Sequence, residues 1–324
     1  MAHVKLQTKG RLLATSLPDN DLFTPLAAEY FPQAIRKRFP EGVADHRLRR
    51  EIVTTCLVNR IVDDGGIGHL LSIQESTGAD TGEGARAFVV ADGVFGITAL
   101  IDAIREQPVS ATVGDDMTRR VRRLLATSSR WLLAHRPQPL AIAAEITRYR
   151  DVADSASDLG GWLRRDDEDP VERAYREAGV DPAVARAVAE SEHRVHLLDV
   201  HDIADIADRD RSEVGELLFA VLDHFGIDRL LAAVDGLDHG DRWHLLARVA
   251  LHDDLLTVLR GLTDSILSMS ETGESPREKI AEWSAGRTAL LARAGATLDE
   301  LTAAGRWDIA TLSVAVRALR SVIG

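Results

Sequence analysis

Helical periodicity runs through almost every segment of this 324-residue chain and constrains its fold more than any other feature. The clearest case is residues 45–66, DHRLRREIVTTCLVNRIVDDGG, where apolar side chains recur every three or four positions between arginines. This spacing predicts a long amphipathic helix with one face turned to a core. Asp45 is suited to cap the start of the helix, and Gly65-Gly66 is suited to end it.

The same pattern predicts further helices along the chain. They cover residues 25–38, 82–106 with a break near 93–96, 110–133, 140–157, 170–178, 182–192, 195–207, 212–225, 228–237, 241–269, 276–294 and 307–322. Prolines stand at the first turns of four of these helices, where the missing amide costs nothing. Gly179, Gly226 and Gly295 are suited to C-terminal caps.

Strand-like alternation occurs only at residues 3–6 and 12–15, so a short N-terminal strand pair is the most β structure we expect. Alternating strand and helix units are absent from the sequence, which excludes a doubly wound sheet. We therefore predict an all-α fold of about a dozen helices.

The predicted helices are interrupted most strongly at residues 155–169, SASDLGGWLRRDDED. We expect an N-terminal linker or extended segment at 1–17, a helical subdomain at 18–157 and a second, acidic subdomain at 158–324. A single continuous domain with a surface loop at this point is the alternative.

Charge is distributed unevenly between the two halves. Residues 1–150 carry 20 Lys and Arg against 17 Asp and Glu, whereas residues 151–324 carry 19 against 34. Such an acidic half does not favour nucleic-acid binding. A membrane span and a signal peptide are not indicated by the sequence, and the single Cys56 excludes internal disulfides, so we expect a cytoplasmic protein.

Residues 82–87, GEGARA, formally match the glycine-rich pattern of dinucleotide sites. That chemistry requires a hydrophobic strand leading into the turn, and the preceding residues are turn formers. We interpret the segment as a loop entering a helix.

Two groups of histidines and acids are candidate metal ligands. One contains Glu190, His193, His196, Asp199 and His201, and the other contains His239, His244, His252, Asp253 and Asp254. A di-iron bundle requires a second E-x-x-H pair and two further carboxylates, which the sequence lacks, so we predict no metal site.

Five arginines make the predicted helix 110–133 basic: Arg119, Arg120, Arg122, Arg123 and Arg130. Stacking aromatic residues are not interleaved with them, so docking onto an acidic surface, such as the acidic half of this chain, is favoured over nucleic-acid binding.

Several short words, in this order, resemble the C-terminal part of the large bacterial NAD-specific glutamate dehydrogenases. They are AEYFP at 28–32, HRLRREI at 46–52, NRIV at 59–62, ESTG at 75–78, RWL at 130–132, RW at 242–243, AR at 247–248 and HDDL at 252–255. Arg47 departs from the family pattern, which usually has proline at that position.

The resemblance implies a parent enzyme that converts L-glutamate, NAD and water to 2-oxoglutarate, ammonium and NADH. Its catalytic residues and NAD site lie in an upstream domain, so this chain is expected to hold no catalytic residue, cofactor or metal. Met1-Ala2-His3 is expected to be an added start ahead of the domain.

We therefore expect a structural or regulatory helical domain that is not catalytic alone and that packs on the catalytic domain of the same polypeptide. The parent is expected to be a homo-oligomer without nucleic-acid or membrane partners. Tyr30, Phe31, Arg49 and Arg50 are the candidate docking residues, because such groups dominate interfaces; burial within this domain is the alternative for them. A stand-alone helical interaction scaffold and a helical metalloenzyme are the other functional alternatives.

Overall fold

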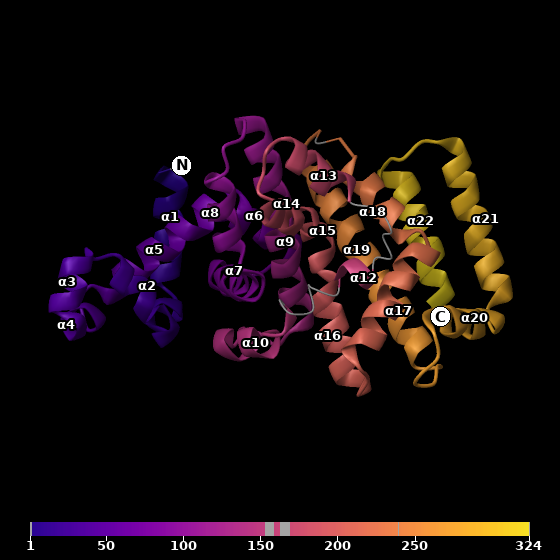
Figure 1. The fold of residues 1–324 in the computed structure, drawn as a ribbon, viewed down its shortest axis with the longest axis horizontal. Helices are drawn as coiled ribbons and strands as arrows, with labels where there is room; N and C mark the ends of the chain where they lie inside the picture. The colour runs from indigo at the N-terminus through magenta and orange to yellow at the C-terminus, as the bar shows by residue number, and fades with distance from the viewer. Residues whose placement is uncertain (1, 153–158, 163–168, 239, 324) are drawn as a thin grey trace. The chain divides into compact units, whose positions relative to one another are not determined.

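The computed structural model describes residues 2–152, 159–162, 169–238 and 240–323, and every regular element in this part of the chain is helical (Figure 1). The predicted all-α class is thereby confirmed. The chain forms two compact units: unit 1 is Met1–Asp154 with Asp167–Val195, and unit 2 is Ser155–Asp166 with His196–Gly324. The predicted boundary region, residues 155–169, lies largely outside the described residues, so the division into 18–157 and 158–324 stays a prediction.

Unit 1 contains most of the short helices. They are α1 (Ala2–Leu13), the 3-10 turns η1 (Leu17–Asp19) and η2 (Asp21–Phe23), α2 (Thr24–Glu29), α3 (Gln33–Arg38), α4 (Pro40–Ala44), α5 (Arg49–Asp64), α6 (His69–Thr77), α7 (Thr81–Phe95), α8 (Ile97–Arg105), α9 (Ala111–His135), α10 (Ile142–Arg148), α13 (Pro170–Glu177), α14 (Pro182–Ala189) and α15 (Ser191–Arg194).

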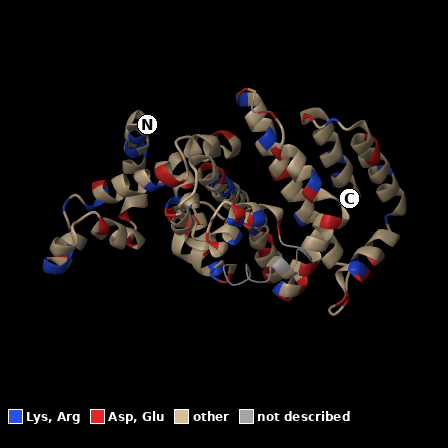
Figure 2. Ribbon diagram, turned by 45° about the horizontal axis from the view of Figure 1, so that its top comes forward, with Lys and Arg blue, Asp and Glu red and all other residues tan. Residues whose placement is uncertain are grey.

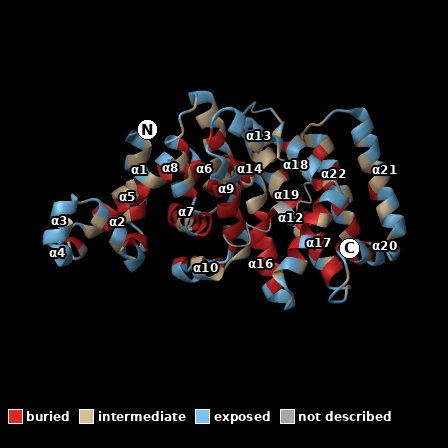
Figure 3. Ribbon diagram, in the orientation of Figure 1, coloured by how far each residue is buried: buried red, intermediate tan, exposed pale blue. Residues whose placement is uncertain are grey.

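The core of unit 1 forms around α9. Met117, Val121, Leu124 and Leu125 make its buried stripe, and α6, α7, α8, α14 and α15 pack against it. Figure 3 shows buried residues concentrated where α7 and α9 meet. Four arginines of α9 lie at the edge of this core, exposed or half-buried, whereas the fifth, Arg130, is buried near the C-terminal end of the helix.

The N-terminal segment is α-helical, so the predicted strand pair and the predicted extended linker at 1–17 are wrong. Thr8 and Leu12 are buried and Val4 is half-buried, which is a spacing of four residues. This spacing matches the contacts that α1 makes with α5 and α7. Packing on these helices therefore outweighs the local alternation that resembles a strand.

Helix boundaries differ from the predictions at several points. Asp45 does not cap α5, which begins at Arg49 after Leu48, because residues 40–44 already form α4. The predicted helix 25–38 is divided at Pro32 into α2 and α3, and the predicted helix 276–294 is divided near Arg287. Gly295 lies inside α21 and therefore does not cap a helix. Because several predicted helices are divided, the described residues contain more helices than the dozen predicted.

Other predicted boundaries are confirmed. The first-turn prolines are found in α2, α13, α14 and α20, as expected. Helix α5 ends at Gly65, and Gly96, with φ +64°, separates α7 from α8. Gly179 and Gly226 also adopt the left-handed conformation, at φ +89° and +62°, which a side chain would strain.

Unit 2 contains the short helix α12 and several longer helices. They are α12 (Leu159–Trp162), α16 (His196–Ala207), α17 (Arg211–His224), α18 (Ile227–Asp235), α19 (Arg242–Leu267), α20 (Pro276–Ala285), α21 (Thr288–Ala304) and α22 (Ile309–Ile323). Helix α19 is central, since α17, α18, α20 and α22 all contact it. Asp241 caps its start by accepting a hydrogen bond from the His244 amide.

A tryptophan from the short helix α12 lies directly over a glycine of α17. A Cβ on Gly215 would stand 2.7 Å from ring carbons of Trp162, whose indole also stacks on Phe219 with ring centroids 6.0 Å apart. The residue at 215 is therefore fixed as glycine by close packing.

Among the described residues, no single helix is long and apolar enough to cross a membrane; α7 and α8 meet such criteria only as a pair, with a bend of 70° between them.

The close approach at Gly215 gives a stability prediction. Gly215→Ala should lower the free energy of unfolding by about 1–3 kcal/mol, because the indole of Trp162 must move to admit the methyl group. Gly295→Ala is the matched control: it lies inside α21 with open space around its Cβ position, so it should raise stability by up to about 1 kcal/mol. Urea denaturation of both variants measures the difference, and equal effects would contradict the packing argument.

Candidate functional site: docking residues and buried ion pairs

Two of the four candidate docking residues lie at the surface of unit 1. Tyr30 is 59% exposed, and Phe31 is half-buried between Tyr30 and His46, with ring centroids 5.6 and 5.3 Å away. The aromatic pair follows α2 and precedes α3. The structure therefore leaves Tyr30 accessible to a partner and uses Phe31 in part as a local contact.

Arg49, by contrast, is engaged inside unit 1. Its guanidinium donates hydrogen bonds to the carbonyl oxygens of Pro18 (3.4 Å) and Asn20 (3.2 Å) and to Thr24 Oγ1 (3.1 Å). These bonds hold the two 3-10 turns against α5, and the carbonyl oxygen of Asn20 also accepts from the Phe23 amide.

Arg50 does the same for the end of α1. It donates to the carbonyl oxygens of Leu13 and Thr15, both at 2.6 Å, and pairs with Asp19. The two arginines thus attach the connection between α1 and α2 to α5, and both are half-buried. Their role in docking stays a prediction.

The glycine-rich segment at residues 82–87 is the first turn of α7. The amides of Gly82 and Glu83 donate to the Asp80 carboxylate, and the Asp80 amide donates to the Glu83 carboxylate, which completes a capping box. A Cβ on Gly82 would lie 3.1 Å from Thr15, and one on Gly84 would lie 3.1 Å from Leu70. These glycines serve helix packing. The Gly82 amide already donates to the Asp80 carboxylate, and the Gly84 amide donates to the Asp80 carbonyl oxygen.

The first histidine group is divided between the two units. Glu190 pairs with Arg194 at 3.1 Å in unit 1, while Asp199 and Asp202 of unit 2 both bind Arg260, at 2.7 and 2.6 Å. The carboxylates of this group therefore have arginine partners.

In the second group, His244 bonds the capping Asp241, Asp254 binds Arg320 at 2.7 Å, and His239 lies outside the described residues. No cluster of three or more metal-binding side chains occurs in the part of the chain that the structure describes.

Arginines of α9 also find partners within unit 1. Arg119 and Arg120 both pair with Asp116, which accepts a further hydrogen bond from Tyr175. Arg122 donates to the carbonyl oxygens of Asp63 and Asp64, at 2.9 and 2.7 Å. These residues fix the neighbours of α9. Arg120 also pairs at 3.5 Å with Glu192, which belongs to the acidic half of the sequence, and docking of the other arginines onto that half stays a prediction.

The carboxylate of Asp64 is almost fully buried between three helices. It binds Arg105 at 3.0 Å and accepts from Thr98 Oγ1 at 3.2 Å. Burial raises the pKa of Asp64 in spite of these bonds. The adjacent pair Asp63-Asp64 is thus a structural feature of unit 1.

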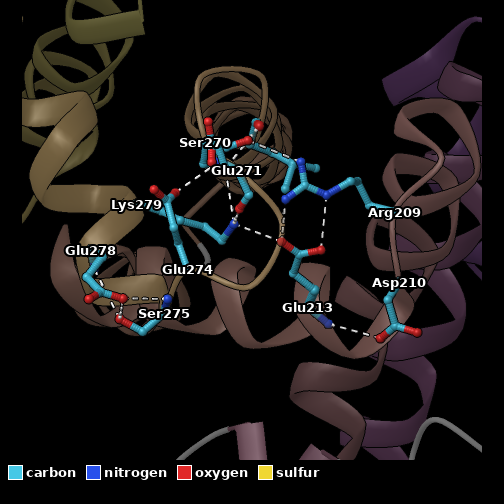
Figure 4. Close-up of polar contacts among 10 residues, drawn as sticks. Arg209, Asp210, Glu213, Ser270, Glu271, Glu274, Ser275, Glu278 and Lys279 are labelled. Atoms are coloured by element: carbon cyan, nitrogen blue, oxygen red, sulfur yellow. Dashed lines mark hydrogen bonds and ion pairs between the residues drawn. The ribbon is translucent and has the colours of Figure 1, made fainter.

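Unit 2 contains a buried lysine whose three ammonium protons all have acceptors (Figure 4). Lys279 of α20 is 1% exposed and donates to Glu213 Oε1 (2.8 Å), Ser270 Oγ (3.2 Å) and the carbonyl oxygen of Glu271 (2.6 Å). Since an ammonium group has three donors, this arrangement satisfies it completely.

Glu213 links this lysine to a second cation. Both of its carboxylate oxygens bind Arg209, which also donates to the carbonyl oxygen of Ser270 at 3.2 Å. Hydrogen bonds from Arg209, with those from Lys279, lower the pKa of Glu213 to about 2. The Lys279–Glu213–Arg209 network therefore ties α17, α20 and the loop between α19 and α20 together.

His69 is the second strongly perturbed group. It lies buried on α6 against Phe88, with ring centroids 5.8 Å apart, and its Nε2 has no hydrogen-bond partner among the described residues. Burial lowers the pKa of His69 to about 4, and the neighbouring Arg130 contributes to the shift. The imidazole is therefore neutral at pH 7.

With this geometry established, comparison with known proteins decides the family. Residues 1–321 match the family described as "Glutamate dehydrogenase, C-terminal". The chain belongs to this family. It is 44% identical over 324 residues, 99% of its length, to the NAD-specific glutamate dehydrogenase of Mycobacterium tuberculosis. It is 29% identical over 328 residues, 98% of its length, to that of Pseudomonas aeruginosa, and 27% identical over 325 residues, again 98%, to that of Halomonas elongata.

The chain spans about one fifth of the length of these relatives, 20% in each case. This glutamate dehydrogenase C-terminal domain therefore corresponds to a part of a much longer enzyme. The resemblance seen in the short sequence words is confirmed.

Sequence reasoning missed the structural roles of Lys279 and His69. One signal was available for Lys279, since it is one of only four lysines in an arginine-rich chain. The burial of His69 carried no such signal, because it follows a glycine-rich turn that gave no helical pattern.

The network in unit 2 gives a pH-dependent prediction. Glu213→Gln leaves the Lys279 ammonium buried without a counter-charge, so unfolding in urea at pH 7 should require about 3 kcal/mol less free energy. The folded-state pKa of Glu213 lies below the ordinary 4.5, so its stabilisation is complete above pH 4.5 and declines as pH falls toward 2. The difference in the free energy of unfolding between wild type and Glu213→Gln should therefore narrow as the pH falls from 4.5 toward 2. Glu216→Gln, exposed on the same helix, is the control and should change stability by less than about 0.5 kcal/mol.

His69 gives a second pH-dependent prediction in a different window. Its folded pKa is below the ordinary 6.5, so the neutral form stabilises the fold above pH 6.5 and this contribution declines as pH falls toward 4. Between pH 6.5 and 4, wild type should lose about 3 kcal/mol more stability than His69→Leu. His3→Leu, at an exposed position of α1, should follow wild type. If the free energy of unfolding of wild type and of His69→Leu changes with pH in parallel, the conclusion that His69 is buried and neutral is refuted.

Proposed function

We propose that this chain is a structural or regulatory helical domain of an NAD-dependent glutamate dehydrogenase and is not catalytic alone. The parent reaction converts L-glutamate, NAD and water to 2-oxoglutarate, ammonium and NADH. The family match over residues 1–321 carries this proposal, since the relatives it joins are NAD-specific glutamate dehydrogenases.

The chemistry of the described residues supports the non-catalytic role. Oxidation of glutamate by NAD requires a dinucleotide site and a group that moves the substrate's proton. The glycine-rich turn at Gly82 is packed and capped, and the strongly perturbed carboxylate Glu213 is held by Lys279 and Arg209. These groups are occupied by structural partners, so NAD is assigned to the catalytic domain of the parent.

The proposed partner is the catalytic domain of the same polypeptide, in a cytoplasmic homo-oligomer without nucleic acid or membrane contact. Tyr30 and Phe31 are the first candidates for this docking, because an exposed aromatic ring next to a half-buried one is typical of interface anchors. Arg49 and Arg50 contribute by holding α1 and α2 on α5, which positions the aromatic pair.

A stand-alone interaction scaffold is the alternative from another functional class. It is less well supported, because the family relatives carry about four fifths of their length outside this region. The metalloenzyme alternative has no support from the described residues, whose candidate carboxylates bind arginines.

Activity measurements test the proposal directly. The isolated 324-residue chain should produce no glutamate-dependent NADH, whereas the full-length enzyme should turn over. Removal of this region from the full-length enzyme should reduce turnover or change its oligomeric state, measured by absorbance at the NADH band and by light scattering. Turnover by the isolated chain, or a truncated enzyme with unchanged turnover and oligomeric state, would contradict the proposed role.

A further inference from the structure

Residues 30–48 form a projecting part of unit 1, which we call the basic arm. Helix α3 contacts α4, and α4 contacts α2, which in turn rests on α5 (Figure 1). Helix α3 has no buried residue at all. A six-residue helix without a buried face gains little stability from its own hydrogen bonds, so a partner that covers α3 would stabilise it.

Apolar side chains on the arm face solvent. Tyr30 is 59% exposed, Ile35 41%, Phe39 52% and Leu48 45%. Ile35 lies on α3 and Phe39 directly follows this helix, with the Phe39 amide donating to the carbonyl oxygen of Ile35 at 2.9 Å. Exposed large side chains in one short segment are typical of interaction sites and not of an ordinary surface.

The cations of the arm are unpaired, in contrast to many others of unit 1. Arg36, Lys37 and Arg38 form no ion pair with any described residue, and neither does Arg47. Arg38 instead lies over the ring of Phe39, 5.3 Å from its centroid. Figure 2 shows the basic tip at the far left of the ribbon. The arm carries four cations and two carboxylates in a chain whose net charge is −12.

We propose that the basic arm docks onto an acidic surface with an apolar depression, formed by the part of the same polypeptide that lies outside this chain. This inference rests on the proposed function and deepens it by naming the surface and its partner chemistry. Unpaired cations around exposed aromatic and aliphatic side chains are complementary to carboxylates that surround an apolar site.

Two arguments favour this partner over others. About four fifths of each relative lies outside the matched region, and a surface on the same polypeptide is tethered to the arm and so meets it at a high effective concentration. An anionic membrane is disfavoured, because the chain as a whole is acidic and is repelled from such a surface.

Lys37 gives a specific chemical test, since it is the only lysine on the arm. Zero-length carbodiimide coupling joins a lysine to a carboxylate that it touches. In the full-length enzyme, Lys37 should couple to an Asp or Glu outside the 324 residues. The yield of this product should not fall when the enzyme is diluted before coupling. Coupling instead to residues 196–324 of a second copy, or no coupling of Lys37 at all, would overturn the proposal. Binding of the enzyme to phosphatidylserine vesicles by way of the basic arm, detected by co-sedimentation, would also overturn the proposal.

Hydrogen exchange of the full-length enzyme tests whether α3 is covered. Amides of residues 33–38 should exchange at least about tenfold more slowly in wild type than in Lys37→Glu/Arg38→Glu or Ile35→Ser/Phe39→Ser. Lys9→Glu/Arg11→Glu, a double reversal of unpaired cations on α1, is the matched control and should exchange as wild type does. Unchanged exchange of α9 and α22 shows that the variants are folded. Exchange of residues 33–38 in wild type at the rate of an unstructured peptide would overturn the proposal.

The docking inference and the proposed function fail separately. A truncated enzyme that keeps full turnover and assembly would contradict the structural role, but the Lys37 cross-link in the full-length enzyme would still support the docking. If the enzyme depends on this domain but forms no Lys37 cross-link and the amides of α3 exchange freely, only the docking proposal is contradicted.

Discussion

Burial of a single apolar stripe on each long helix is the constraint on which both units depend. The apolar stripe of α9 packs against α6, α7, α8, α14 and α15. The stripe of α19 packs against α17, α18, α20 and α22. Because the stripe is narrow, polar side chains begin immediately beside the core. Charged residues at this edge meet their partners in a partly dry environment, where an unpaired charge is costly. This explains why so many arginines and carboxylates of the chain bind each other or backbone carbonyls.

The class of the fold was predictable, because periodicity, first-turn prolines and glycine caps are local features. Tertiary packing was not predictable from them. Helix α1 forms on α5 and α7 although its residues alternate like a strand, and the break between α2 and α3 depends on Pro32. The docking prediction met the same difficulty. Tyr30 and Arg49 are both plausible interface residues by type, and only the structure shows that Arg49 binds carbonyl oxygens within unit 1 while Tyr30 is exposed.

Lysine and arginine have different roles in this domain. Arginine is the abundant cation and is used at places where a planar, many-donor group binds two or three acceptors, as Arg50 and Arg209 do. Lysine occurs four times, and two of the four are at distinctive positions: Lys279 in a fully satisfied buried pocket and Lys37 at the exposed basic tip. The compact ammonium of Lys279 fits a site with three single acceptors, which a guanidinium would overfill.

The indole of Trp162 has a consequence for dissecting this domain into pieces. The chain passes from unit 1 into unit 2 at residue 155, returns at 167 and crosses again at 196, so unit 2 is assembled from two separate segments. A fragment that starts at His196 would lack the ring that covers Gly215 and stacks on Phe219. Such a fragment would have a hollow of tryptophan size in its hydrophobic interior, and a single cut in the gene does not yield two intact halves.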